Sequence, residues 1–141
     1  MTLLPRFACA ALGLALASLA TAAADAPPAP GLTGAWVAEE IVGERMYHHI
    51  PPTLVFTDAT HLGGDTQCSS YSARYDRYGE QGLSIRALIR PHHACADPDS
   101  QARANRYFNA LEEVNRMELR SDGALILRTP IRGSITFRRA E

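Results

Sequence analysis

Two cysteines limit most strongly what this chain can fold into. Cys68 follows a glycine-rich segment, Cys95 follows a pair of histidines, and each lies next to segments that alternate like β-strands. Adjacent antiparallel strands would bring the two thiols together, and an even number of cysteines in an exported protein is typical of a disulfide. We therefore expect one Cys68–Cys95 disulfide, which would stabilise the fold by roughly 3.5 kcal/mol because it closes the intervening loop.

Residues 1–24 are typical of a secretory signal peptide, which predicts a periplasmic protein. Arg6 precedes an apolar run over residues 7–20, and small residues follow, so cleavage is expected near Ala24. The third cysteine, Cys9, lies inside this signal. A membrane span needs about 20 strongly apolar residues, whereas this run is mostly alanine, so we expect no membrane-spanning segment after cleavage.

The rest of the chain is long enough for a single domain. Residues 25–31 combine prolines with alanines and are expected to form an extended tether, and the domain itself is expected at residues 32–141. The formal net charge of −1 argues against a nucleic-acid-binding surface. Every basic residue other than histidine is an arginine, which excludes Schiff-base chemistry by a lysine. We expect a monomer.

Short segments of alternating polarity predict a mainly β domain. The paired Gly63 and Gly64 indicate a bulge or a close approach of two backbones, and Asp122-Gly123 indicates a tight hairpin. Residues 44–52 are polar and irregular and are expected to form a loop. The expected strands are residues 34–43, 53–56, 61–65, 70–76, 83–90, 117–120, 125–128 and 134–138.

One helix is expected at residues 98–114. Asp97 can cap its first turn, Pro98 fits the first helical position, and apolar residues recur at helical spacing on one face. The sequence therefore predicts a mainly β (α+β) fold. It would be a small curved antiparallel sheet or a barrel-like fold of about seven or eight strands, with one α-helix before the C-terminal hairpin.

His92 and His93 suggest an alternative use of the cysteine segment, a zinc or copper site. Imidazole and thiolate are common ligands of both metals. However, the cysteines form no close Cys-x-x-Cys pair, and an oxidised thiol no longer binds metal. Our leading prediction is therefore no metal and no cofactor, and the histidine site remains the alternative. Further candidate ligands are Cys68, Cys95, His48, His49 and His61.

No group of residues matches a catalytic pattern. Ser69 and Ser70 lie near histidines and Asp65, but the Gly-x-Ser-x-Gly turn of serine hydrolases does not accompany them. Helix capping and the helix dipole explain the carboxylates of Asp97 and Asp99. We therefore expect no catalytic residues.

Several short motifs occur in an order that resembles the META domain family of HslJ-like bacterial envelope proteins. They are the Gly-x-Trp of residues 34–36, the strand ending in Phe at 54–56, the cysteine segment at 67–69, the Ala-Cys of 94–95 and the Phe-Arg of 137–138. The resemblance covers residues 32–139. It implies a β-rich, barrel-like fold, an envelope location and an association with stress tolerance and antibiotic resistance, and the family has no agreed catalytic residues.

The sequence thus predicts a noncatalytic periplasmic META-like protein with a role in binding or in maintaining the envelope under stress. Its partner would be an unknown protein or small molecule of the cell envelope. The alternative is a periplasmic zinc- or copper-binding protein that uses His92 and His93.

Overall fold

The structure is a computed structural model that describes residues 13, 26–91 and 93–141. The expected signal peptide, apart from residue 13, and His92 lie outside the described residues. Helix α1 (Pro98–Glu113) separates six strands from three more. The strands are β1 (Ala35–Ile41), β2 (Glu44–Arg45), β3 (Thr53–Phe56), β4 (His61–Asp65), β5 (Ser70–Tyr78), β6 (Gly82–Ile89), β7 (Arg116–Leu119), β8 (Leu125–Arg128) and β9 (Ser134–Arg139).

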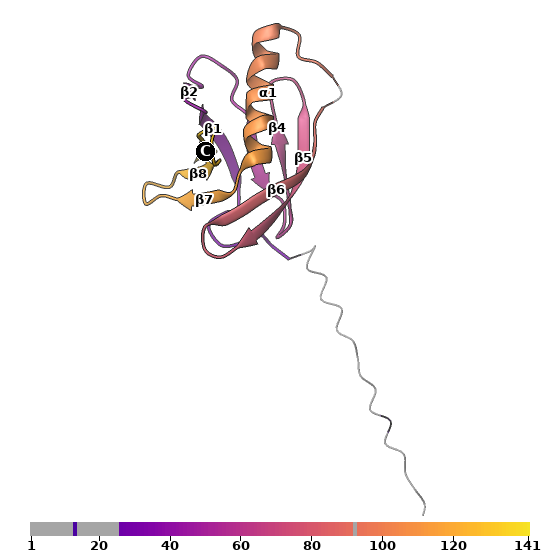
Figure 1. The fold of residues 1–141 in the computed structure, drawn as a ribbon, viewed down its shortest axis with the longest axis vertical. Coiled ribbons are helices and arrows are strands. Elements are labelled where there is room, and N and C mark those ends of the chain that lie inside the picture. The colour runs from indigo at the N-terminus through magenta and orange to yellow at the C-terminus, as the bar shows by residue number, and fades with distance from the viewer. Residues whose placement is uncertain (1–12, 14–25, 92) are drawn as a thin grey trace, which may run out of the picture.

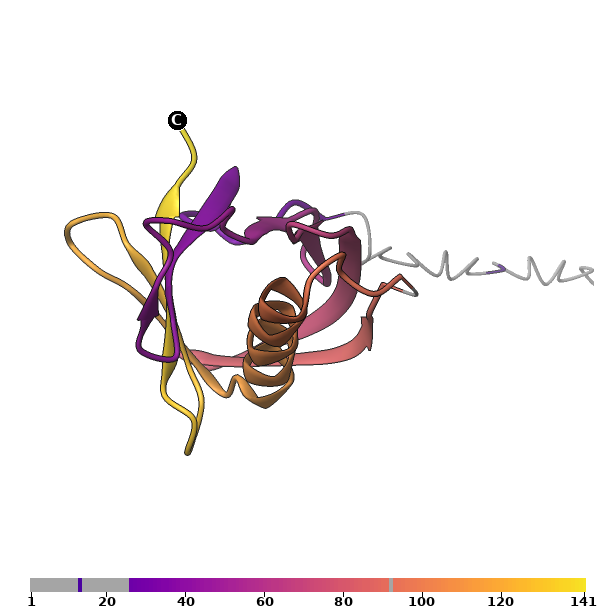
Figure 2. The same ribbon diagram turned by 90° about the horizontal axis from the view of Figure 1, so that it is seen from above.

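Eight of the strands close into an antiparallel β-barrel. From β3 to β9 each strand pairs with the next, and β1 pairs with both β3 and β9, so the first long strand and the last one complete the ring. Strand β2 pairs only with the end of β1. Helix α1 runs along the barrel next to β6 (Figure 1) and, seen from above, lies at the β6 side of the ring of strands, with part of it over the interior (Figure 2). The predicted mainly β, barrel-like fold with one helix is confirmed.

The interior of the barrel is filled by side chains from the strands and the helix. Trp36, Tyr75 and Phe137 from three strands are almost completely buried. The helix begins at Pro98 with Asp97 as its cap, as the sequence predicts, and ends one residue earlier than predicted. Its inward face contributes the buried residues Ser100, Ala104, Tyr107, Phe108, Ala110 and Leu111.

Strand β2 corrects the prediction that residues 44–52 form a loop throughout. Val42 and Gly43 both have positive φ angles, 48° and 84°, and make the two-residue turn that joins β1 to β2. Val42 is fixed there because its N–H donates to the Ser134 carbonyl at 2.9 Å. A β-branched residue rarely adopts this conformation, so the sequence gives no sign of the turn.

The glycine pair on β4 allows the close backbone approach that the sequence predicts. A Cβ atom at Gly64 would collide with the backbone carbonyl of Thr53 on β3. A Cβ atom at Gly63 would lie 2.9 Å from the carbonyl oxygen of Tyr71 on β5. Strands β3, β4 and β5 can therefore lie as they do only if these two positions carry no side chain.

The described part of the expected tether lies against the barrel. The Ala59 N–H donates to the Ala26 carbonyl at 2.8 Å, and the Gly31 carbonyl accepts from Arg139 at 2.7 Å. Ala29 is partly buried against the core. Residues 26–31 of the expected extended tether are therefore attached to the domain at several points. Within the described residues, no helix has both the length and the apolar character needed to cross a membrane.

Candidate functional site

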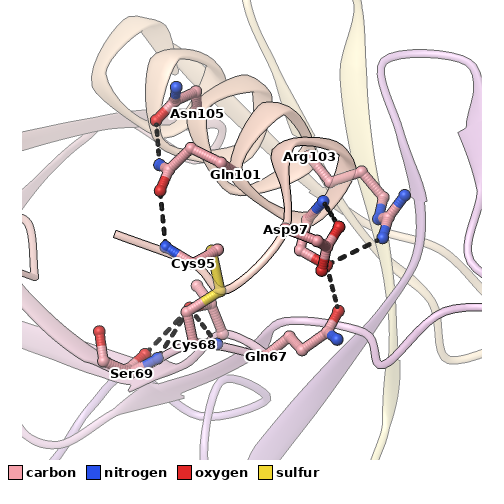
Figure 3. The surroundings of a disulfide bond; sticks show 10 residues. Gln67, Cys68, Ser69, Cys95, Asp97, Gln101, Arg103 and Asn105 are labelled. Carbon is pink, nitrogen blue, oxygen red and sulfur yellow. Dashed lines mark hydrogen bonds between the residues drawn. A yellow bond between two sulfur atoms is a disulfide. The ribbon is translucent and has the colours of Figure 1, made fainter. Parts of the chain in front are cut away.

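The structure joins the two cysteines from the sequence analysis. Cys68 and Cys95 form a disulfide between residues 27 apart in the chain, with Cα atoms 5.2 Å apart. The bond connects the loop between β4 and β5 to the segment that enters α1 (Figure 3). Neither sulfur is therefore a thiolate nucleophile or a thiolate ligand for metal in this state.

Hydrogen bonds reinforce the disulfide where the helix begins. The Ser100 N–H donates to the Asp97 carboxylate at 2.8 Å, and the Ser100 hydroxyl donates to the same carboxylate at 2.7 Å. These two bonds, first that of the side chain, lower the pKa of Asp97. The Cys95 N–H donates to the side-chain carbonyl of Gln101 at 2.8 Å (Figure 3). The disulfide therefore belongs to a structural connection between loop and helix.

The structure does not gather the histidines into a metal site within the residues it describes. No three His, Cys, Asp or Glu side chains among them are placed to hold an ion together. His93 lines a hollow of about 70 Å³ beside the disulfide, and His92 lies outside the described residues. His49 lies 3.8 Å from Glu44, and His61, the first residue of β4, lies 3.0 Å from Asp58 in the turn before it.

A larger hollow, of about 490 Å³, lies on the outside of β4, β5 and β6, and we call it the outer groove. Gly63 on β4 and Ser72 on β5 are paired across the two strands, and their small size leaves room above the sheet. The lining residues are Thr57, His61, Leu62, Gly63, Tyr71, Ser72, Ala73, Arg74, Ala87 and Ile89.

A β-bulge on β6 shapes one side of the outer groove. Arg74 pairs with Arg86, whereas Ser72 pairs with Ile89, so β6 contains one extra residue between these pairs. Ala87 has a φ angle of 53°, in the left-handed region. The extra residue turns Ile89 to the outside, where it is 64% exposed.

Three basic side chains form a row across the sheet beside this groove. His61 pairs with Arg74, and Arg74 pairs in turn with Arg86. The His61 imidazole lies 3.0 Å from Asp58, and the Arg86 Nε atom lies 2.6 Å from Asp76. Arg74, between them, makes no ion pair or side-chain hydrogen bond with another residue of the described chain.

The pKa shifts of the two carboxylates agree with this pairing. The pKa of Asp58 is lowered, first by the hydrogen bond from the Thr60 N–H and also by the bonds from His61. The pKa of Asp76 is lowered, first by its hydrogen bond from Arg86. Both carboxylates are therefore ionised at neutral pH.

The hydroxyl groups of two buried tyrosines form hydrogen bonds with each other and with the backbone inside the barrel. The Tyr71 hydroxyl donates to the Thr53 carbonyl at 2.6 Å, and the Tyr107 hydroxyl lies 2.6 Å from the Tyr71 oxygen. The Tyr107 hydroxyl can therefore donate to Tyr71. Burial raises the pKa of both tyrosines well above the ordinary value, so both remain neutral hydrogen-bonding groups at neutral pH.

A comparison with protein families gives a match to the META domain over residues 30–141. The chain belongs to the META domain family. The resemblance predicted from the ordered motifs is thereby confirmed, and a META domain with a disulfide indicates an extracytoplasmic protein. No curated protein matches the chain.

Solved structures share the fold of this META domain at low sequence identity. A protein from Burkholderia xenovorans, solved by NMR, is 20% identical, with a TM-score of 0.58 and 99% of each chain covered. Another NMR structure is 20% identical with a TM-score of 0.59, over 77% of this chain and 90% of that one. A DUF4847 family protein from Bacteroides vulgatus is 12% identical with a TM-score of 0.60, over 79% of this chain and 95% of that one.

The outer groove is the feature of this META domain that the sequence analysis missed. Nearly all of its lining residues lie on three different strands, so only the strand register brings them together. The bulge was hidden because Leu83 to Arg90 reads as one strand ending before Pro91. An alanine with positive φ leaves no mark in a sequence, in contrast to a glycine.

Proposed function

We propose that this META domain protein is a noncatalytic, monomeric protein of the periplasm that binds a molecule of the cell envelope and helps to maintain the envelope under stress. Family membership, the disulfide and the signal expected at residues 1–24 support the location. The outer groove supports the binding role.

Side chains fill the interior of the barrel, whereas its outer surface carries the outer groove, and this contrast supports the proposal. Tyr71 and Tyr107 meet in the interior, and the inward face of α1 packs into it. Binding therefore uses the outside of the barrel. There the outer groove combines an exposed isoleucine with an arginine that lacks an acidic partner among the described residues.

The noncatalytic assignment is supported by the way reactive groups are used. Both cysteines of the domain are oxidised, and the Ser100 hydroxyl belongs to the helix cap. Asp58 and His61 are the pair most similar to a general base, because the carboxylate orients the imidazole. Turnover of a generic ester, peptide or phosphate substrate that His61→Gln abolishes would contradict the assignment.

A complementation experiment tests the binding role. A strain lacking the gene, grown with an antibiotic that damages the envelope, is complemented with wild type, Ser72→Trp or Ser84→Trp. Ser72 lines the outer groove, whereas Ser84 lies on β6 outside it, opposite Asp76. We expect wild type and Ser84→Trp to restore growth and Ser72→Trp to fail at equal periplasmic abundance and equal thermal stability. Restoration by Ser72→Trp would contradict a role for the outer groove.

The location is tested on the same cells. The intact mass of the periplasmic protein, measured after alkylation with and without reductant, should correspond to cleavage near Ala24 and to two thiols that react only after reduction. Protein that stays in the cytoplasm, or reacts without reductant, would contradict the proposed location.

A further inference from the structure

The middle residue of the basic row beside the outer groove, Arg74, makes no ion pair within the described residues. His61, Arg74 and Arg86 lie opposite one another on β4, β5 and β6, and only the outer two have carboxylate partners. Like charges directly opposite each other on a sheet are destabilising. An anion at Arg74 would relieve this repulsion.

The apolar part of the groove lies beside this charge. Ile89 pairs with Ser72, two residues from Arg74 on the same face of β5, and is 64% exposed. Ala87 also lines the hollow. An aliphatic chain placed over Ile89 and Ala87 would be removed from water, which is favourable. A polar group at the end of that chain could then reach Arg74.

We propose that the outer groove binds an amphipathic carboxylate, with the carboxylate at Arg74 and its aliphatic part over Ile89 and Ala87. A guanidinium binds a carboxylate through two parallel hydrogen bonds. One guanidinium without an ion-pair partner matches the single charge of a carboxylate better than the two charges of a phosphate monoester. The volume of about 490 Å³ lies within the roughly 300–1,000 Å³ of small-molecule sites.

Two sources in an envelope would supply this chemistry, a free fatty acid and the C-terminus of an apolar peptide. The inference rests on the proposal that the outer groove is a binding surface, and it adds the class of ligand. The probes are therefore decanoate and an acetylated leucine-alanine tetrapeptide with a free carboxylate. Decanol and the amide of the same peptide lack the charge and serve as their controls.

The experiment is an NMR titration of the oxidised, ¹⁵N-labelled protein, expressed from the full-length gene and purified from the periplasm. We expect decanoate or the peptide acid to cause saturable shifts of the amide signals of Gly63, Ser72, Arg74 and Ala87, with a dissociation constant of about 1 mM or lower. Decanol and the peptide amide should bind at least about tenfold more weakly, because a charge-assisted hydrogen bond is lost. The tighter of the two acids identifies the source.

Two variants separate Arg74 from its neighbour. Arg74→Gln should weaken binding of the acid at least about tenfold, whereas removing the neighbouring ion pair as a unit, with Arg86→Gln and Asp76→Asn together, should leave it within about twofold. Ser72→Trp should block the groove, and Ser84→Trp should not. Unchanged spectra outside the groove show that each variant is folded.

Three results would overturn the inference. They are the absence of saturable shifts for both acids up to about 10 mM, equal binding of decanol, and equal weakening by Arg74→Gln and by the Arg86→Gln/Asp76→Asn double variant. Tighter binding of decyl phosphate than of decanoate would overturn the assignment to carboxylates. The binding role itself would survive any of these results if Ser72→Trp still failed in the complementation experiment.

Discussion

At the scale of single residues, most arginines of this domain have defined partners. Arg90 lies 3.1 Å from Glu112, Arg128 lies 3.0 Å from Glu118, and Arg132 lies 2.7 Å from Glu113. Each pair is exposed and contributes little to stability because water and salt screen it. The pairs neutralise most of the arginine charge on the surface. Arg74 differs from them because it makes no ion pair within the described residues.

The buried tyrosine pair gives a prediction about stability. Tyr71→Phe should lower the free energy of unfolding by about 1–3 kcal/mol, because it leaves the buried Thr53 carbonyl without its closest donor. Tyr107→Phe should lower it by only about 1 kcal/mol, since the Tyr71 hydroxyl can still donate to Thr53. Urea unfolding of both single variants and of the double variant measures these values.

The double variant is the control for coupling between the hydroxyls. Its loss should be smaller than the sum of the two single losses, because the oxygens contact each other at 2.6 Å. Strict additivity, or a larger loss for Tyr107→Phe than for Tyr71→Phe, would mean that the hydrogen bonds do not run from Tyr107 through Tyr71 to Thr53.

At the scale of elements, the sequence predicts those whose signals are local. Helix α1 is found where Asp97 and Pro98 place its start, and the Asp122-Gly123 turn joins β7 to β8 as expected. Strand β2 was missed because its turn uses Val42 with a positive φ angle. The outer groove was missed because it depends on a bulge and on the register of three strands, which are set by packing between distant segments.

The bulge on β6 gives a prediction at this scale. Ala87 has a φ angle of 53°, and the left-handed conformation costs an L-residue roughly 1–2 kcal/mol relative to the right-handed one. Ala87→Gly should therefore keep or raise the free energy of unfolding, by up to about 1 kcal/mol, since glycine has no such restriction but loses more chain entropy. Thermal or urea unfolding measures the change.

A matched substitution on β1 controls for the effect of glycine itself. Ala35 is an exposed strand residue that is absent from the positive-φ positions. Ala35→Gly should therefore lower the free energy of unfolding by about 0.5–1 kcal/mol. If both variants lost the same amount, the backbone at Ala87 would carry no strain.

At the scale of the whole molecule, the fold combines a closed sheet with a helix that packs one face into the barrel. Strands β6 and β7 share only the pair Gly82 and Arg116. Between them the chain leaves the sheet, forms α1 and rejoins the sheet at β7. The helix supplies core side chains, and the disulfide fixes its entry to the loop after β4. The two cysteines in the sequence therefore mark the place where the helix is covalently attached to the barrel.

Removal of the disulfide tests this arrangement. Replacing both Cys68 and Cys95 by alanine should lower the free energy of unfolding by roughly 3.5 kcal/mol, because the unfolded chain regains the freedom of the 27-residue loop. Guanidinium unfolding measures the loss. Wild-type protein in reductant should lose a similar amount, whereas reductant should not change the alanine variant. A loss below about 1 kcal/mol would mean that the hydrogen bonds around Asp97 hold the helix entry without the covalent bond.

The pairing of β1 with β9 determines when the molecule can finish folding. Strand β1 comes first in the domain, and its neighbour on one side is formed by residues 134–139, made almost a hundred positions later. A growing chain can therefore form hairpins, but it cannot close the ring before its last strand has been synthesised. A protein with this topology stays unfinished for as long as the ribosome holds its end, and an unfinished chain is the form that can be threaded through a narrow export channel.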